Sequence, residues 1–136
     1  MTADVNVVID HSEYTILVVD DVVSNVLLLK VLLTNEKFKV VTANNGKDAL
    51  VQAAEKQPDL ILLDVMMPEM NGYETTKAIR NLSNRPDGKE IPIIAMTANA
   101  FAEDVQAALD AGMDDHVAKP MNMDILISAI EKCVKR

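Results

Sequence analysis

Residues 60–64 read LILLD, four consecutive aliphatic side chains followed by a carboxylate. The run is short and does not alternate apolar with polar residues, which is typical of a strand buried on both faces of a parallel sheet. Comparable runs, most of them rich in β-branched residues, occur at 15–19, 39–43, 91–96 and 116–118. The sequence therefore predicts five short strands, most of them covered on both sides.

The segments between these runs have the composition and spacing of helices. They cover residues 24–35, 47–56, 73–82, 101–109 and 123–134. Asn45 and Asn122 are candidate N-caps, and Gly112 is expected to end the fourth helix. A strand followed by a helix, five times over, predicts an α/β fold with a doubly wound, five-stranded parallel sheet and helices on both of its faces.

The composition fits a single compact domain. Of the 136 residues 49% are hydrophobic, and 21 acidic against 13 basic side chains give a net charge of −8. This acidity argues against direct binding of nucleic acid and suits a metal cation or a basic partner, although an ordinary acidic surface would look the same. No apolar run approaches the roughly 20 residues of a membrane span, so we expect no membrane contact and a cytoplasmic location.

The chain divides into two unequal parts. Residues 1–13 precede the first strand and are expected to be an N-terminal extension or linker, with an added edge element or a disordered lead as alternatives. Residues 14–136 contain all the predicted strands and helices and form the main domain. We expect no output domain after Arg136, which is a further reason not to expect direct DNA binding.

Polar side chains follow four of the five predicted strands. In open α/β sheets, ligands bind outside the carboxyl ends of the strands. The strands that reach this edge end in Asp20-Asp21, Asp64, Thr97 and Lys119. Each of these residues alone is more often structural, but their joint placement at one edge of the sheet is specific. We therefore expect three carboxylates, a hydroxyl and an ammonium group to converge there.

Such a cluster has a definite chemistry. Three neighbouring carboxylates repel one another unless a cation lies between them, and Mg²⁺ prefers oxygen ligands of this kind. A carboxylate attacks a phosphate group poorly because like charges meet, and a metal ion together with Lys119 would lower that barrier. Thr97 would donate a hydrogen bond to a phosphoryl oxygen. The product on Asp64 would be an aspartyl phosphate.

The motifs at these strand ends resemble those of response-regulator receiver domains. They read ILVVDD at 16–21, LLDVMMP at 62–68, MNG at 70–72, AMTA at 95–98 and AKP at 118–120. The resemblance covers residues 14–136 and implies the flavodoxin-like, CheY-like strand order 2-1-3-4-5. It also implies a magnesium site in which Asp21 is a direct ligand, Asp20 binds largely through water, and Asp64 and the backbone carbonyl of Met66 contribute.

The resemblance assigns the remaining roles residue by residue. Asp64 would be the phosphoacceptor, and Thr97 and the Ala98 N–H would bind phosphoryl oxygens. Lys119 would pair with the carboxylate or the phosphoryl group, and its bond to Pro120 would be cis. His116 stands where the family often has Tyr or Phe, an aromatic residue that swings inward when Thr97 moves. A switching role and a plain surface position are both open for His116.

The implied function is that of a two-component phosphorelay. A histidine kinase or a histidine phosphotransfer protein would donate the phosphoryl group, and a downstream partner would bind through the fourth helix, fifth strand and fifth helix. The domain would promote its own phosphorylation and dephosphorylation without being a conventional enzyme. The amino-acid sequences of the motifs at 67–72 and 96–100 favour the receiver of a hybrid histidine kinase over a stand-alone regulator.

Three alternatives have other signatures. A binding-only module with this fold would have no need for three converging acids. A haloacid-dehalogenase-type hydrolase would place a second acid two residues after its nucleophile on the first strand, but position 22 is Val. A flavodoxin-like cofactor site would need a Gly-rich or Ser/Thr-rich loop there, and the whole chain has only four glycines.

Overall fold

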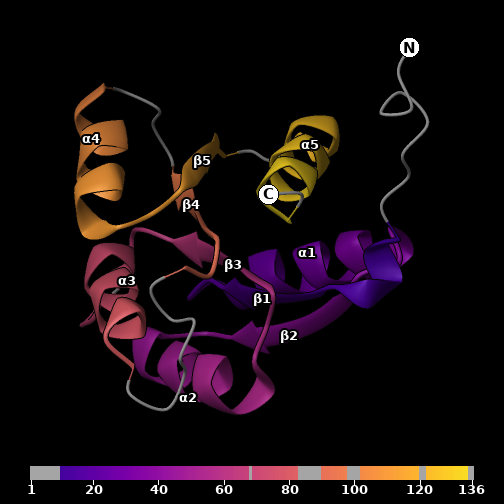
Figure 1. Cartoon of the computed structure of the whole chain (residues 1–136), viewed down its shortest axis with the longest axis horizontal. Coiled ribbons are helices and arrows are strands. Elements are labelled where there is room, and N and C mark those ends of the chain that lie inside the picture. Colours follow the sequence, from indigo (N-terminus) through magenta and orange to yellow (C-terminus); the bar gives the residue numbers. More distant parts are fainter. Residues whose placement is uncertain (1–9, 68, 83–89, 98–101, 120–121, 135–136) are drawn as a thin grey trace.

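The computed structural model describes residues 10–67, 69–82, 90–97, 102–119 and 122–134. A five-stranded sheet runs through the middle of the molecule, and helices pack on both of its faces (Figure 1). The strands are β1 (Thr15–Val19), β2 (Lys39–Ala43), β3 (Leu60–Asp64), β4 (Ile93–Thr97) and β5 (Asp115–Ala118). The helices are η2 (His11–Glu13, a 3₁₀ turn), α1 (Val23–Asn35), α2 (Gly46–Lys56), α3 (Gly72–Arg80), α4 (Ala102–Ala111) and α5 (Met123–Val134).

The sheet is parallel throughout and has the order β2-β1-β3-β4-β5, which confirms the predicted topology. The chain moves from β1 outward to β2 and then returns to place β3 on the other side of β1. This reversal creates a crevice at the carboxyl ends of β1 and β3, where ligands bind in folds of this type. Val19 is level with Leu63 in the register, so Asp20 and Asp64 follow at the same height.

The two faces of the sheet carry separate hydrophobic clusters. Alternate residues of β1 point to opposite sides, with Leu17 in one cluster and Ile16 in the other. One cluster packs under α2, α3 and α4, and the other under α1 and α5. All five residues of β3 and all five of β4 are buried, as their continuous apolar sequences predict.

The ends of the elements follow local chemistry. Asn45 accepts a hydrogen bond from the Asp48 N–H at 2.7 Å, which confirms the N-cap of α2. Asn122 accepts bonds from two amides at the start of α5, and Gly112 has a φ of 102° just after α4. The prediction that a strand begins at residue 91 was two residues early, because Pro92 has no N–H to give to the sheet.

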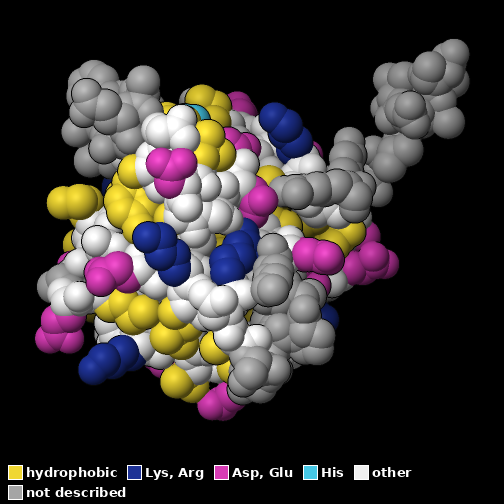
Figure 2. All heavy atoms as spheres, turned by 60° about the vertical axis from the view of Figure 1, so that its left-hand side comes forward, with side chains coloured by type: hydrophobic (Ala, Val, Ile, Leu, Met, Phe, Trp, Pro, Cys, Tyr) yellow, Lys and Arg dark blue, Asp and Glu magenta, His cyan; other side chains and the backbone are white. Residues whose placement is uncertain are grey.

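The surface is mixed in character. Turning the molecule so that the side of α3 and α4 comes forward shows several separate hydrophobic patches between charged side chains (Figure 2). No helix within the described ranges is long and apolar enough to cross a membrane.

Candidate functional site

Three carboxylates meet at the carboxyl ends of β1 and β3. Oxygen atoms of Asp20, Asp21 and Asp64 all lie within 4.8 Å of one another. Asp20 has no exposed surface and Asp64 is 3% exposed, whereas Asp21 is open to solvent. Two acids are therefore withdrawn from water while the third faces it, as expected of a cavity that admits a ligand from one side.

Lys119 brings a positive charge to this cluster. Its Nζ lies 3.2 Å from an oxygen of Asp20 and 3.2 Å from an oxygen of Asp64. Burial alone would lower the pKa of Lys119, but the hydrogen bond and charge of Asp64, with the charge of Asp20, outweigh it and raise the pKa. The ammonium group therefore stays charged. The Lys119 N–H also donates to the Thr97 carbonyl at 2.8 Å, which ties the end of β5 to the end of β4.

Asp20 is held by the start of α1. One of its oxygens accepts a hydrogen bond from the Val22 N–H at 2.9 Å, and the other accepts from the Asn25 side chain at 3.3 Å. Val22 is the N-cap of α1 but has no side chain that can cap the helix, so the carboxylate of Asp20 accepts the hydrogen bonds of this first turn instead. Sequence reasoning missed Asn25. Its only signal is an amide in the first turn of a mostly apolar helix.

Asp64 is fixed by the loop that leads to α3. It accepts a hydrogen bond from the Met66 N–H at 3.2 Å, and the Val65 N–H donates to the Met96 carbonyl at 3.2 Å. A side chain at Gly72 would lie 2.5 Å from the Asp64 carbonyl oxygen, so only glycine fits there. Burial, followed by the charge of Asp20, raises the pKa of Asp64 despite the opposing contacts of Met66 and Lys119.

The remaining predicted residues fall into three groups. Thr97 is buried at the end of β4, one residue beyond Met96, which is level with Asp64 in the sheet. The Met66 side chain is 73% exposed, so only its backbone could serve the site. His116 is half-buried on β5. Ala98 and Pro120 lie outside the described residues, and their predicted roles stay predictions.

An apolar surface adjoins the acids. The side chains of Val23, Leu27, Leu28 and Val31 on α1 are each more than half exposed. A pocket of about 210 Å³ lies between this helix and the site, with Asp20 and Lys119 in its wall beside leucines of α1. Exposed helix faces are normally polar, so this one is suited to contact with another molecule.

The donor set fits a hard divalent cation. Lys119 balances only one of the three acidic charges, and carboxylate oxygens are the ligands that Mg²⁺ prefers. One of the acids is exposed, which leaves a route for a hydrated ion and for a phosphate group.

The comparisons with known proteins agree with this geometry. Residues 16–131 match the model of the response regulator receiver domain. The sensor histidine kinase GacS of Pseudomonas protegens is 40% identical over 118 residues, which cover 86% of this chain and 13% of that protein. The chain thus spans about an eighth of the length of this relative. It belongs to the response regulator receiver family.

Solved structures show the same fold. The chemotaxis protein CheY4 of Vibrio cholerae has a TM-score of 0.82 and 31% identity over 88% of this chain and 98% of that one. The receiver domain of the sensor histidine kinase PA1611 from Pseudomonas aeruginosa has a TM-score of 0.81 and 32% identity over 90% and 98%. The latter structure is described with a magnesium ion coordinated in its active site cleft.

Proposed function

We propose that this chain is a phosphoacceptor of a two-component phosphorelay and that Asp64 receives the phosphoryl group from a phosphohistidine. The observation that carries the proposal is the position of Lys119, whose Nζ lies 3.2 Å from both Asp20 and Asp64 at the edge where a substrate can enter. A purely structural ion pair would need one acid. Here two acids share one ammonium group, and the carboxylate of Asp21 lies close to both of them.

The transfer step follows from the site. An oxygen of Asp64 forms the new P–O bond while the P–N bond of the donor breaks; the imidazole nitrogen keeps the electron pair of that bond and takes up a proton from solvent water. Lys119 draws negative charge away from the attacking carboxylate and the phosphoryl oxygens. Asp20, Asp21, Asp64 and the Met66 carbonyl would hold Mg²⁺, which when bound neutralises charge on the phosphoryl group. The hydroxyl of Thr97 would donate a hydrogen bond to a phosphoryl oxygen.

Phosphorylation of Asp64 would change the surface that the domain presents to a downstream partner. Phosphorylation replaces the single negative charge of the Asp64 carboxylate with a group of roughly two negative charges beside Thr97 and Lys119. Thr97 ends β4, which precedes α4, and Lys119 directly follows β5, which precedes α5, so their movement would bias the face formed by α4, β5 and α5. His116 on β5 would follow Thr97. Leu109 on α4 and Ile125 on α5 are both more than half exposed and are suited to bind the downstream partner.

The donor would dock on the exposed apolar face of α1. Val23, Leu27 and Val31 are spaced four residues apart, so they form one stripe along the helix. The helix begins two residues after Asp21, and a donor histidine that reaches Asp64 must cover the neighbouring surface. We therefore propose that the donor presents an apolar helix, as histidine kinases and phosphotransfer proteins would. The chain is then one receiver of a hybrid kinase or a separate regulator.

The test is phosphorylation by acetyl phosphate, measured as intact mass with and without Mg²⁺. We expect one phosphoryl adduct that requires Mg²⁺ and is absent from Asp64→Asn. The matched control is Asp110→Asn, which removes an exposed carboxylate on α4 and should leave the adduct unchanged.

The same experiment distinguishes the phosphoacceptor from the main alternative, a binding-only module with this fold. A folded domain that gains no adduct from acetyl phosphate, and none from a phosphorylated histidine kinase, would support the binding-only module. An adduct that persists in Asp64→Asn would mean that another residue is the acceptor.

A further inference from the structure

The imidazole of His11 is held by three separate parts of the domain. Its Nδ1 lies 2.6 Å from the Glu36 carbonyl oxygen at the end of α1, and its Nε2 lies 2.8 Å from Oε2 of Glu131 on α5. The ring stacks on the buried ring of Phe38, with centroids 4.1 Å apart and planes at 10°. Only 14% of the His11 side chain is exposed. A residue outside the sheet therefore has the surroundings of an internal one.

These contacts require a charged imidazole. The carbonyl oxygen can only accept, so Nδ1 must donate, and Nε2 faces a carboxylate. A neutral ring has a single N–H, whereas the imidazolium has two. Burial lowers the pKa of His11, but the hydrogen bonds and charges of Glu131 and Glu36 more than reverse this and raise it. The charges of Glu131 and Glu36 act on the ring, the charge of the ring acts in turn on Asp10, and all three of these groups are acidic.

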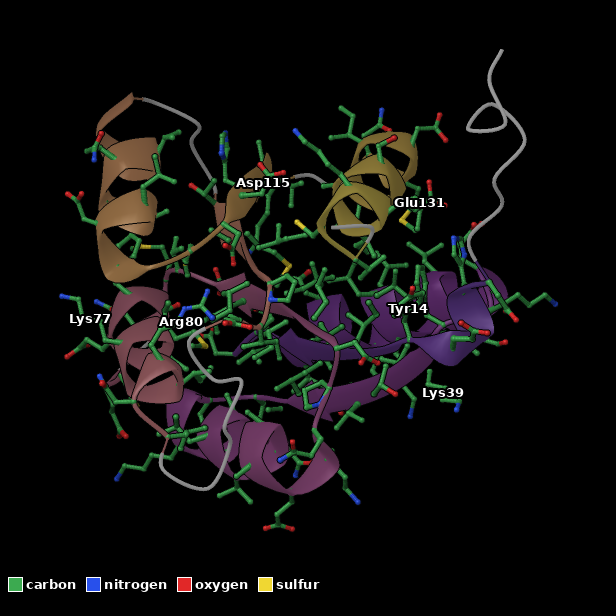
Figure 3. All side chains as sticks on the ribbon, viewed as in Figure 1. Tyr14, Lys39, Lys77, Arg80, Asp115 and Glu131 are labelled. Carbon is green, nitrogen blue, oxygen red and sulfur yellow. The ribbon has the colours of Figure 1, made fainter. Side chains whose placement is uncertain are left out.

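The residues next to His11 form a small ordered unit. The Ser12 N–H donates to the Asp10 side chain at 3.0 Å, the Glu13 N–H to the Asp10 carbonyl, and the Tyr14 N–H to the His11 carbonyl. Tyr14 packs against the cluster under α1 and α5. Glu131 lies on the side of α5 that faces this segment (Figure 3). Residues 10–14 are thus seated between the end of α1 and the outer part of α5.

We propose that His11 is a pH-dependent latch that fastens the segment leading into the domain to α5. The latch is closed when the ring carries two N–H groups and opens when Nε2 loses its proton and its lone pair faces the Glu131 carboxylate. Because α5 also belongs to the proposed partner face, the latch links the position of residues 10–14 to the position of α5. This regulatory contact does not depend on phosphorylation of Asp64.

The pH range follows from the direction of the shift. A folded-state pKa above the ordinary value of about 6.5 means that the latch contributes its full stability below that pH. The contribution is lost as the pH rises through the folded-state pKa. The latch is therefore closed at a pH below about 6.5 and opens only as the pH passes above the raised folded-state pKa of His11.

The test is a proton NMR titration of the histidine rings in the whole chain. The His11 midpoint should lie above about 6.5, and Glu131→Gln should move it down by about half a pH unit. The control Glu55→Gln removes one acid from α2 and should leave the midpoint unchanged. In parallel, the hydrogen-exchange protection of the Ser12, Glu13 and Tyr14 amides, corrected for intrinsic rates, should fall several-fold as His11 deprotonates.

His11→Gln provides the second variant, because its side chain does not titrate. Protection of these three amides should then become independent of pH. A His11 midpoint at or below about 6.5, a midpoint that Glu131→Gln does not move, or protection in the unmodified chain that stays constant through the titration would each overturn the latch.

Discussion

At the site, one ammonium group faces an excess of negative charge from three carboxylates. Lys119 contacts Asp20 and Asp64 equally, at 3.2 Å, and Asp21 adds a third acid. The excess of negative charge destabilises the fold and at the same time prepares the site for a cation. Functional sites often keep such local costs because the rest of the domain supports them.

Asp64→Asn should therefore stabilise the metal-free domain at pH 7, by about 1 kcal/mol or roughly 4 °C in Tm. The pKa of Asp64 is raised by burial and by Asp20, so folding favours the protonated form. That contribution is present at low pH and is lost as the pH rises through the folded-state pKa, which leaves a cost at neutrality. Thermal unfolding in EDTA at several pH values measures the difference, which should shrink in acid. A variant less stable than the unmodified chain at pH 7 would contradict this account.

Gly72 and Gly46 offer a matched pair of substitutions. A Cβ at Gly72 would lie 2.5 Å from the Asp64 carbonyl oxygen and 2.7 Å from the Cα of Val65, both in the backbone. A Cβ at Gly46 would meet the side chains of Thr75 and Met70, and the long Met70 can move. Gly72→Ala should cost about 1–3 kcal/mol and Gly46→Ala clearly less.

Chemical denaturation measures both costs, and acetyl phosphate labelling shows whether Asp64 has moved. Gly72→Ala should also label more slowly, because the loop that fixes Asp64 must shift. Equal costs for the two variants would mean that the β3–α3 loop adjusts freely.

At the scale of elements, sequence patterns predicted the regular parts well. Continuous apolar runs marked β3 and β4 because buried parallel strands carry no polar alternation. Asparagine and glycine marked the helix ends because their side-chain and backbone chemistry is local. The three-residue η2 was not predicted, since it is too short for a periodicity and its stability comes from His11 contacts with distant residues.

Arg80 on α3 connects this helix to the segments beside β4 and α4, a contact that sequence alone did not reveal. Its guanidinium donates to the carbonyls of Ile91, just before β4, and of Gly112, just after α4, and it pairs with Asp114 at 2.9 Å. Arg80→Met keeps much of the packing but leaves these acceptors without their donor, so it should cost about 2–3 kcal/mol. Lys77 lies on the same helix and points away from the sheet, as Figure 3 shows.

Lys77→Met is therefore the control for loss of one positive charge near the end of α3, with an expected effect within about 0.5 kcal/mol. Both values come from urea unfolding followed by circular dichroism. Similar costs for the two variants would show that the charge, rather than the bonds to the carbonyls, is what Arg80 contributes.

At the scale of the whole molecule, the fold places the site. The switch of direction between β1 and β3 brings Asp20, Asp21 and Asp64 together although Asp20 and Asp64 are 44 positions apart in the sequence. Alternation of strands and helices predicted the fold class, but the strand order came from the resemblance, because pairing between distant strands leaves no local pattern. The double contact of Lys119 and the exposure of α1 likewise depend on how distant elements meet.

The exposed stripe of α1 leads to a prediction about recognition. Replacing Leu27 and Val31 together by Gln should leave stability within about 1 kcal/mol, because both side chains are more than half exposed. Phosphorylation by acetyl phosphate should be unchanged, since a small donor needs only the acids and Lys119. Transfer from a phosphorylated histidine domain that labels the unmodified chain should fall at least tenfold, because apolar contacts of this size contribute about 1–3 kcal/mol to docking.

The comparison of the two donors makes the result specific. The control pair Val51→Gln and Leu109→Gln removes exposed apolar side chains from α2 and α4 and should leave transfer from the protein donor intact. Transfer followed by radiolabel over time, at donor concentrations below saturation, separates weaker docking from slower chemistry. Equal loss with both donors would mean that α1 supports the site rather than the partner. Undiminished transfer from the protein donor would move the docking surface away from α1, and the face around α4, β5 and α5 would then have to serve donor and downstream partner alike.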